Sequence, residues 1–288
     1  MKLSGATTVV GVIGDPVSHS LSPAIHNAAF EVLRLDWIYV AFPVPRGRGG
    51  AAVAAARDLG LAGFNVTMPH KADVAAACDE LTPEAAALCS VNTVVAQPDG
   101  VMLGDSTDGP GFLAALAEEG IAVEGRRALV LGAGGAGRAV ILALGRAGAE
   151  VVVAARRPEA ASAAARLATA GRAVAFPDAS KEATSADLVV NATPLGMAGE
   201  PPPIDPASLG PAQAVVDLVY HPAETPLLAA AGARGCRTAN GLGMLVHQAA
   251  RSFTLWTGAD APLEAMRAAA EAAIATSAQK KPGTQRAF

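Results

Sequence analysis

Three glycines near the middle of the chain have the spacing of a phosphate-binding turn. Gly132, Gly134 and Gly137 form G-x-G-x-x-G, directly after the apolar run ALVL and at the start of a helix-like stretch. The motif alone is weak evidence, but here it has the strand–turn–helix context that dinucleotide binding requires. Backbone N–H groups at such a helix start can hold phosphates, whereas a glycine-rich turn without a ligand is the alternative. The dinucleotide interpretation assigns the contact to Gly132, Ala133, Gly134, Gly135, Ala136 and Gly137.

The end of the following strand indicates which dinucleotide would bind. An NAD-binding chain normally has an acidic residue about 20 residues past the first glycine, where it holds the ribose hydroxyls. In VVVAARRPE this position carries Ala154 or Ala155, followed by Arg156 and Arg157. Two guanidinium groups suit a 2′-phosphate, and a basic helix start is the other interpretation. The missing carboxylate and the two arginines favour NADP.

A third group of polar residues lies in the stretch GFNVTMPHK, residues 63–71. An apolar, strand-like run reaches a corner formed by Asn65, Thr67 and Lys71, and Pro69 prevents the strand from continuing. A surface lysine after a turn is the ordinary explanation. A lysine that belongs to a site is the other, and the choice depends on which distant residues converge on the same place.

The elements that must position these residues alternate between strand and helix. Apolar runs predict strands over 9–13, 37–42 and 63–67, and a short strand pair over 91–96 and 101–103. Helices are expected between the strands: Ser22 followed by Pro23 predicts an N-cap and a helix to about Leu35, an alanine-rich helix ends near Leu59, and Thr82 opens a short helix. Alternation of this kind favours parallel sheets covered by helices.

The pattern starts again after Asp108. A helix over about 109–119 leads to the strand, glycine turn and helix of RALVLGAGGAGRAVILAL, and further strands are predicted over 151–155, 187–193 and 214–220. The alanine-rich stretch 159–170 fits a helix. Two last helices, over about 242–257 and 262–277, end in a polar tail.

Composition bounds the class of protein. The chain of 288 residues is 51% hydrophobic and 17% charged, which excludes a wholly disordered chain and allows two domains. A net charge of −4 gives no basic patch for nucleic acid or anionic lipid. The three cysteines and five histidines show no metal-ligand spacing, and no stretch reads as a signal peptide or a membrane span. We therefore expect a cytoplasmic protein with reduced thiols and no metal.

The motifs, in their order and spacing, resemble those of the shikimate dehydrogenase family over about residues 8–275. The matching stretches are VIGDPVSHSLSPAIHN (12–27), GFNVTMPHK (63–71), SVNTVV (90–95), STDG (106–109), GAGGAGRA (132–139), NATPLGM (191–197), DLVYHPAETPLL (217–228), GLGMLVHQAA (241–250) and WTG (256–258). The resemblance implies an α/β fold in which an N-terminal substrate-binding domain and a Rossmann-type NADP-binding domain enclose a cleft.

The same resemblance implies where the domains begin and end. The substrate-binding domain would comprise residues 1–108 and be completed by C-terminal helices over 240–278. The Rossmann domain would comprise 109–239, and 279–288 would form a flexible tail.

Family membership also implies a catalytic pair, Lys71 and Asp108, that face each other across the substrate. Reduction of a ketone by hydride transfer needs a proton at the oxygen as negative charge develops there. An ammonium can supply that proton, and a neighbouring carboxylate can orient it. The implied activity is the NADP-dependent, reversible reduction of 3-dehydroshikimate to shikimate, a step of chorismate and aromatic amino acid biosynthesis.

Further roles follow from matching positions in the family motifs. Ser20 is placed at the substrate carboxylate, whereas Ser22 has either that role or only that of a helix cap. Residues implied to contact the substrate are Ser20, Ser22, Asn65, Thr67, Lys71, Asn92, Asp108, Tyr220 and Gln248. Residues implied to contact the cofactor, beside the glycine turn and the two arginines, are Thr193, Leu218, Gly241 and Met244.

Departures from the usual family pattern leave more than one substrate compatible with the sequence. Ser90, Ser106 and His70 replace residues that family members commonly carry beside the site, and none removes a catalytic group. A dehydrogenase acting on quinate, aminoshikimate or a related cyclic polyol acid is the second interpretation, and a metabolite-sensing relative without catalysis is the third. A monomer and a homodimer are both compatible with the sequence.

Overall fold

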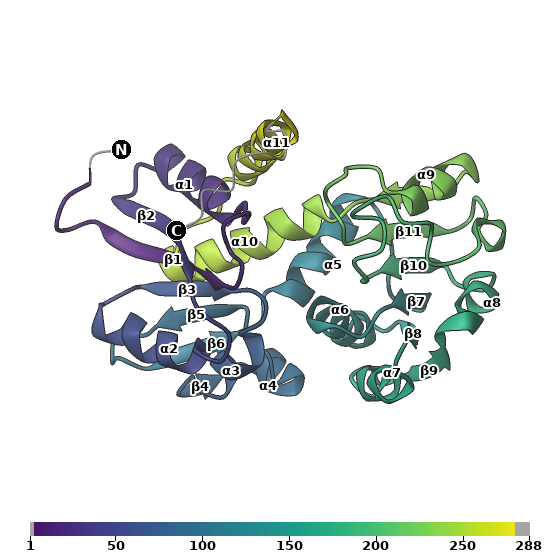
Figure 1. Ribbon diagram of the computed structural model, residues 1–288, viewed down its shortest axis with the longest axis horizontal. Helices are drawn as coiled ribbons and strands as arrows, with labels where there is room; N and C mark the ends of the chain where they lie inside the picture. Colours follow the sequence, from purple (N-terminus) through teal and green to yellow (C-terminus); the bar gives the residue numbers. More distant parts are fainter. Residues whose placement is uncertain (1–2, 280–288) are drawn as a thin grey trace.

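The computed structural model describes residues 3–279 and contains two six-stranded sheets joined by helices (Figure 1). The first sheet has the strand order β2-β1-β3-β5-β6-β4. Its strands are β1 (Thr8–Gly14), β2 (Trp37–Pro43), β3 (Gly63–Val66), β4 (Glu80–Leu81), β5 (Thr93–Ala96) and β6 (Met102–Asp105). The helices that accompany it are α1 (Ser22–Val32), α2 (Gly49–Asp58), α3 (Lys71–Ala75) and α4 (Pro83–Leu88).

The second sheet has the order β12-β11-β10-β7-β8-β9, and every strand pair in it is parallel. Its strands are β7 (Arg127–Leu131), β8 (Glu150–Ala155), β9 (Gly171–Ala175), β10 (Leu188–Asn191), β11 (Ala214–Asp217) and β12 (Arg237–Ala239). Its helices are α6 (Gly135–Arg146), α7 (Pro158–Ala165), α8 (Ala179–Ala183) and α9 (Pro226–Ala233), with short 3-10 turns over Phe176–Asp178 and Pro206–Ser208. Counted from β7, this is the doubly wound order of dinucleotide-binding sheets.

Three helices connect or cover the two halves: α5 (Asp108–Glu118), α10 (Leu242–Thr257) and α11 (Leu263–Gln279). Helix α10 lies against α5 and returns the chain to the first sheet, as Figure 1 shows. Its Val246 and Phe253 share a buried cluster with Val10 of β1 and Ile25 of α1. Residues separated by more than 200 positions therefore form one core.

Strand β5 makes the first sheet mixed, so the parallel pairing expected from the strand–helix alternation holds there only for the pairs that do not involve β5. It pairs antiparallel with both β3 and β6. The connection from β5 to β6 contains only residues 97–101, and a link this short joins antiparallel neighbours, because a parallel pair needs a crossover of a dozen or more residues. The predicted strand pair over 91–96 and 101–103 is this hairpin, and the α/β fold class is confirmed.

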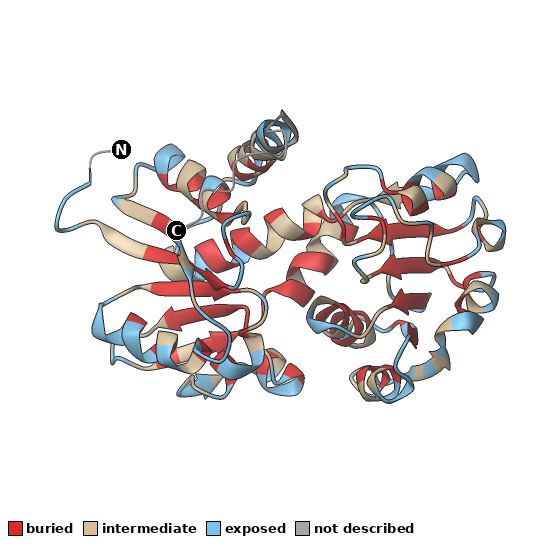
Figure 2. Ribbon diagram, in the orientation of Figure 1, coloured by how far each residue is buried: buried red, intermediate tan, exposed pale blue. Residues whose placement is uncertain are grey.

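Burial follows the pattern that two covered sheets require. Figure 2 shows buried residues along the central strands of both sheets and on the inner faces of α5, α6 and α10. Strands β10 and β11 are buried along their whole length. This explains why their sequences read as continuous apolar runs rather than alternating ones.

Several local predictions need correction. Ser22 was expected to cap α1, but it is the first residue of the helix, and Leu21 occupies the N-cap without a side-chain hydrogen bond. The predicted cap at Thr82 is confirmed, because its hydroxyl accepts a hydrogen bond from the backbone N–H of Ala85. Strands β4, β9 and β12 and helix α3 were missed, since each is five residues or shorter and shows little periodicity.

No helix within residues 3–279 is long and apolar enough to cross a membrane. The expected flexible tail over 279–288 lies, beyond Gln279, outside the described residues.

Candidate active site

A cavity of about 290 Å³ lies in the cleft between the two halves; we call it the cleft cavity. It is lined by every residue that the sequence assigned to the substrate or to catalysis: Ser20, Ser22, Asn65, Thr67, Lys71, Asn92, Asp108, Tyr220 and Gln248. Ala136 and Leu218 of the second half close its other side, together with Gly241 and Met244 at the start of α10. The fold thus collects these side chains from both halves of the molecule into one place.

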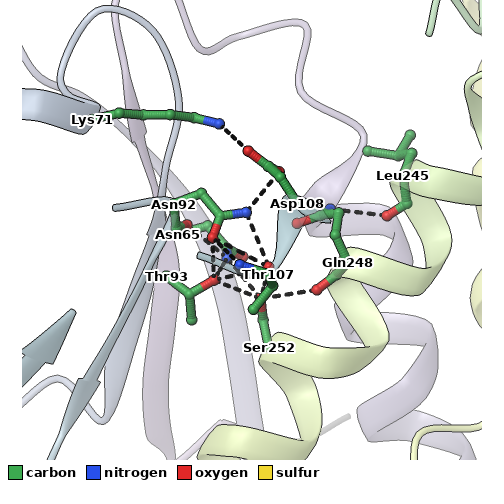
Figure 3. Close-up of polar contacts among 9 residues, drawn as sticks. All are labelled: Asn65, Lys71, Asn92, Thr93, Thr107, Asp108, Leu245, Gln248 and Ser252. Atoms are coloured by element: carbon green, nitrogen blue, oxygen red, sulfur yellow. Dashed lines mark hydrogen bonds and ion pairs between the residues drawn. The ribbon is translucent and has the colours of Figure 1, made fainter. Parts of the chain in front are cut away.

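Lys71 and Asp108 form an ion pair at the edge of the first sheet that faces the cleft cavity (Figure 3). Lys71 is the first residue of α3, after the turn that ends β3, and Asp108 is the first residue of α5, after β6. The Lys71 ammonium donates to Asp108 Oδ2 over 2.6 Å. Their side chains are 21% and 12% exposed, so the pair is largely shielded yet still reaches the cavity.

The second oxygen of Asp108 is held separately. Asn92 donates from Nδ2 to Asp108 Oδ1 over 2.8 Å and to Thr107 Oγ1 over 2.9 Å. The orientation of this amide is set by its other end, because Asn92 Oδ1 accepts from the backbone N–H of Thr107 over 2.7 Å. A carboxylate with both oxygens engaged cannot rotate freely, and this fixes the direction in which the lysine faces.

The side of the cavity formed by the first sheet rests on buried polar side chains, as Figure 3 shows. We call this set the buried polar network; its members are Asn65, Asn92, Thr93, Thr107 and Ser252. Asn65 Nδ2 faces Thr93 Oγ1 and Ser252 Oγ at 3.0 Å each. Buried polar groups are costly unless they are paired, so this network is held in one arrangement.

Two aromatic residues support the network from behind. Tyr39 donates its hydroxyl to Asn65 Oδ1 over 2.8 Å, and burial raises the pKa of Tyr39. The ring of His26 stacks on Tyr39 with 4.4 Å between the ring centroids. Burial lowers the pKa of His26 to about 3, so the imidazole is neutral at ordinary pH and acts as a packing surface.

The proposed carboxylate end contains Ser20 and Ser22. The backbone N–H of Ser22 donates to Ser20 Oγ over 3.3 Å, which places the Ser20 side chain at the entrance of α1. Ser22 is almost fully buried, whereas Ser20 is only half-buried. Ser20 is therefore the more available of the two for a ligand.

A second cavity of about 620 Å³ lies at the carboxyl ends of the strands of the second sheet; we call it the glycine-turn cavity. It is lined by Gly132, Ala133, Gly134, Ala155, Arg156, Arg157, Ala160, Phe176, Ala192, Thr193, Pro194 and Leu195. The strand order reverses between β7 and β10, and ligands of doubly wound sheets bind at this switch point. Arg156 and Arg157 are exposed at its rim.

The glycines of this turn fit a phosphate-bearing group. Gly132 has a φ of +107°, and a Cβ there would lie 2.8 Å from the carbonyl oxygen of Ala192. A Cβ on Gly137 would lie 2.6 Å from the carbonyl oxygen of Gly132, so this glycine allows helix and strand to pack. Around Gly134 nothing lies within 4 Å of a Cβ, which leaves an open cradle at the start of α6. A pyrophosphate can approach the backbone there.

The remaining predicted cofactor residues divide between the two cavities. Thr193 lines the glycine-turn cavity, and Leu218, Gly241 and Met244 line the cleft cavity. Only glycine fits at position 241, because a Cβ would lie 2.0 Å from the carbonyl oxygen of Leu218. Gly135 and Gly137 line neither cavity.

The loops that carry Thr193 and Leu218 are joined beneath the surface by one carboxylate. Asp217 accepts hydrogen bonds from Asn191 Nδ2, from the backbone N–H of Val219 and from the hydroxyl of Thr225. Burial raises the pKa of Asp217, while these three donors act in the opposite direction. The ends of β10 and β11 are therefore held together at the side of the cleft.

The chain matches known proteins over nearly its whole length. Residues 12–94 match the model described as the shikimate dehydrogenase substrate binding domain, and residues 241–271 match that of the shikimate 5′-dehydrogenase C-terminal domain. Residues 127–219 match a model described as NADP oxidoreductase, coenzyme F420-dependent. A shikimate dehydrogenase (NADP(+)) of Citrifermentans bemidjiense is 47% identical over 287 residues, covering 96% of this chain and 99% of the relative. The chain belongs to the shikimate dehydrogenase family.

Solved structures of family members have the same fold. Shikimate 5-dehydrogenase of Thermus thermophilus in complex with NADP(H) and shikimate has a TM-score of 0.85 and 42% identity, covering 92% of this chain and 99% of that one. Quinate dehydrogenase of Corynebacterium glutamicum in complex with NAD has a TM-score of 0.87 and 33% identity, covering 92% and 99%. The resemblance read from the motifs is confirmed.

Three members of the buried polar network in this shikimate dehydrogenase homologue were not singled out from the sequence, and one is Thr93, directly after Asn92 in the SVNTVV motif. Thr107 lies in the STDG motif, directly before Asp108, and this position was the available signal. Ser252 lies in α10 between the GLGMLVHQAA and WTG motifs and belongs to neither, so only the structure reveals it. The three departures Ser90, Ser106 and His70 do not line the cleft cavity.

Proposed function

We propose that this protein is an NADP-dependent shikimate dehydrogenase that catalyses the reversible reduction of 3-dehydroshikimate to shikimate. The observation that carries the proposal is the position of Lys71 between Asp108 and the helix start of the glycine turn. Its ammonium faces Asp108 in the cleft cavity, and its side chain passes the glycine turn, since a Cβ on Gly135 would lie 4.0 Å from Lys71 Cδ. The acid–base pair therefore lies beside the helix start that follows the glycine turn.

The roles of the residues follow from the charge that develops during ketone reduction. NADPH supplies the hydride when it is bound. Lys71 stabilises the negative charge that grows on the carbonyl oxygen and transfers a proton from Nζ to that oxygen. Asp108 keeps the ammonium in place, and Asn92 prevents the carboxylate from turning away. In the reverse direction Lys71 accepts the hydroxyl proton.

The walls of the cleft cavity suit a hydroxylated ring that carries a carboxylate. Thr67 and Gln248 line the cavity with polar groups, the already ordered Asn65 lies beside them, and Ser20 offers a hydroxyl at a helix entrance. A site built to pair substrate hydroxyls rejects analogues that lack them, because its own polar groups then remain unpaired. Within the described residues, no group of histidine, cysteine or acidic side chains could hold a metal ion.

Dehydrogenation of quinate is the second candidate. It is favoured by the similarity to the quinate dehydrogenase of Corynebacterium glutamicum, at 33% identity over 92% of this chain. That protein was solved with NAD, whereas Arg156 and Arg157 line the glycine-turn cavity here. The arginines and the 47% identity to an NADP(+)-dependent shikimate dehydrogenase support the first candidate.

Steady-state kinetics distinguish these candidates. Oxidation rates are measured with shikimate, quinate and aminoshikimate, each with NADP and with NAD. We expect the highest kcat/KM for shikimate with NADP. A higher kcat/KM for quinate with NAD would establish the second candidate, and absence of turnover with every pair would favour a metabolite-sensing protein.

Cytoplasmic location and assembly are further parts of the proposal. Cys78, Cys89 and Cys236 are all free thiols, which suits a reducing compartment. We place the enzyme in the cytoplasm. Light scattering coupled to size-exclusion chromatography distinguishes a monomer of 28.7 kDa from a homodimer.

A further inference from the structure

Ser252 lies in the middle of α10, one turn after Gln248, and is fully buried. It does not line the cleft cavity. Its hydroxyl donates to the carbonyl oxygen of Gln248 over 3.0 Å, the bond that serine commonly makes to the preceding turn of its own helix. The single hydroxyl proton is used in this bond, so toward the first sheet the Ser252 oxygen acts as an acceptor.

Three polar groups face this oxygen from three different segments. Asn65 Nδ2 of β3 lies at 3.0 Å, Thr93 Oγ1 of β5 at 2.8 Å, and Thr107 Oγ1, from the residue before α5, at 3.3 Å. A fixed acceptor at this point sets the direction of the neighbouring hydroxyls. Thr93 Oγ1 lies 3.1 Å from Asn92 Oδ1 and Thr107 Oγ1 lies 3.2 Å from the same oxygen, so both threonines join Ser252 to Asn92.

Asn92 connects this part of the buried polar network to the pair formed by Lys71 and Asp108. Because Asn92 Oδ1 is held by Thr107, its Nδ2 faces Asp108 Oδ1 at 2.8 Å, and Asp108 Oδ2 faces Lys71. A chain of hydrogen bonds therefore runs from α10 to the Lys71 ammonium, as Figure 3 shows. Such networks couple their members more strongly than separate pairs do.

We propose that Ser252 is a positioning residue for catalysis: its hydroxyl orders the buried polar network so that Asn92 holds the Asp108 carboxylate toward Lys71. The inference deepens the proposed function and rests on it. It also gives the returning helix α10 two tasks, since Gln248 lines the cavity while Ser252, one turn later, orders the side chains behind it.

The test is the Ser252→Ala variant, in which Asn65 keeps its bonds to Asn92 and Thr93, so the fold is expected to persist. We expect kcat to fall about fivefold to tenfold, the effect of one hydrogen bond, with the KM for NADP unchanged. Ser252→Cys, which keeps the shape but has a weaker acceptor, is expected to give an intermediate kcat and serves in place of the alanine variant if that one does not fold.

Thr276→Ala is the matched control. It removes the same kind of bond to a preceding helical turn, but on the exposed face of α11, and we expect its kcat to be unchanged.

A second experiment, in a variant that lacks the Asp108 carboxylate, tests whether Ser252 acts through that carboxylate. In an Asp108→Asn enzyme, Ser252→Ala is expected to change kcat less than twofold, because the element that it positions has already been altered. An equal loss in both backgrounds, or no loss in the unaltered enzyme, overturns the inference. Failure of the proposed function is seen separately in the unaltered enzyme, since the variants are compared on whichever tested substrate that enzyme turns over.

Discussion

The two cavities differ in the chemical groups that form their walls. The cleft cavity rests on side chains that are buried and already hydrogen-bonded, such as Asn65, Asn92 and Thr93. The glycine-turn cavity is formed by backbone at Gly132 and Gly134 and by two arginines whose side chains are exposed at its rim. The first site is therefore defined by the orientation of its side chains. The second is defined mainly by backbone at glycines, where no side chain blocks a ligand.

This difference corresponds to what each ligand would require. A small ring with several hydroxyls is recognised by polar groups at fixed positions, and the transition state is stabilised only by groups aligned in advance. A dinucleotide is long and carries its own charges, so a helix start and a few flexible cations are sufficient. Substitutions in the two regions should therefore have different kinetic signatures.

The largest effect is expected at Lys71 and Asp108. Lys71→Ala and Asp108→Ala should each lower kcat by about 10²–10⁴-fold, the usual contribution of a general acid–base group. Binding of NADP, followed by fluorescence titration, should stay within twofold because neither side chain lines the glycine-turn cavity. A kcat near that of the unaltered enzyme in either variant would show that Lys71 is an ordinary surface lysine without a catalytic role.

A smaller effect, confined to cofactor choice, is expected at the arginines. The Arg156→Ala/Arg157→Ala variant should raise the KM for NADP about tenfold or more, since each charge-assisted phosphate contact contributes about 1.5–3 kcal/mol. The KM for NAD should change little, because NAD lacks the 2′-phosphate. Replacement of the exposed Arg166, which does not line the cavity, is the matched control. An unchanged preference for NADP in the double variant would show that these arginines are only surface charges.

The smallest effect separates two glycines of the same turn. In Gly134→Ala the new methyl group meets no protein atom within 4 Å, so the melting temperature should be unchanged while the KM for NADP rises several-fold. In Gly137→Ala the methyl group meets the carbonyl oxygen of Gly132 at 2.6 Å, so the melting temperature should fall. Thermal melts and kinetics of both variants check the pair. A lower melting temperature in Gly134→Ala with no change in KM would contradict the open cradle.

Local rules were sufficient for the elements with strong patterns. The glycine turn, the cap at Thr82 and the apolar strands β10 and β11 could be read directly, because backbone conformation and burial depend there on a few neighbouring residues. The N-cap at Ser22 was predicted wrongly, since Ser–Pro at a helix start is compatible with either the cap or the first turn. Short edge strands such as β4 carried too few residues for a period to be visible.

What the sequence by itself determined is therefore the set of chemical groups and their order along the chain: a lysine after one strand, an aspartate before one helix, a glycine turn and a pair of arginines. Only the tertiary structure decided that Lys71 and Asp108 lie 2.6 Å apart, and that Ser252 joins their supporting network from a helix that returns more than 140 residues later. The physical reason is that periodicity and turn chemistry act between near neighbours in the chain. Contacts across the cleft depend instead on how the sheets and the returning helix pack together.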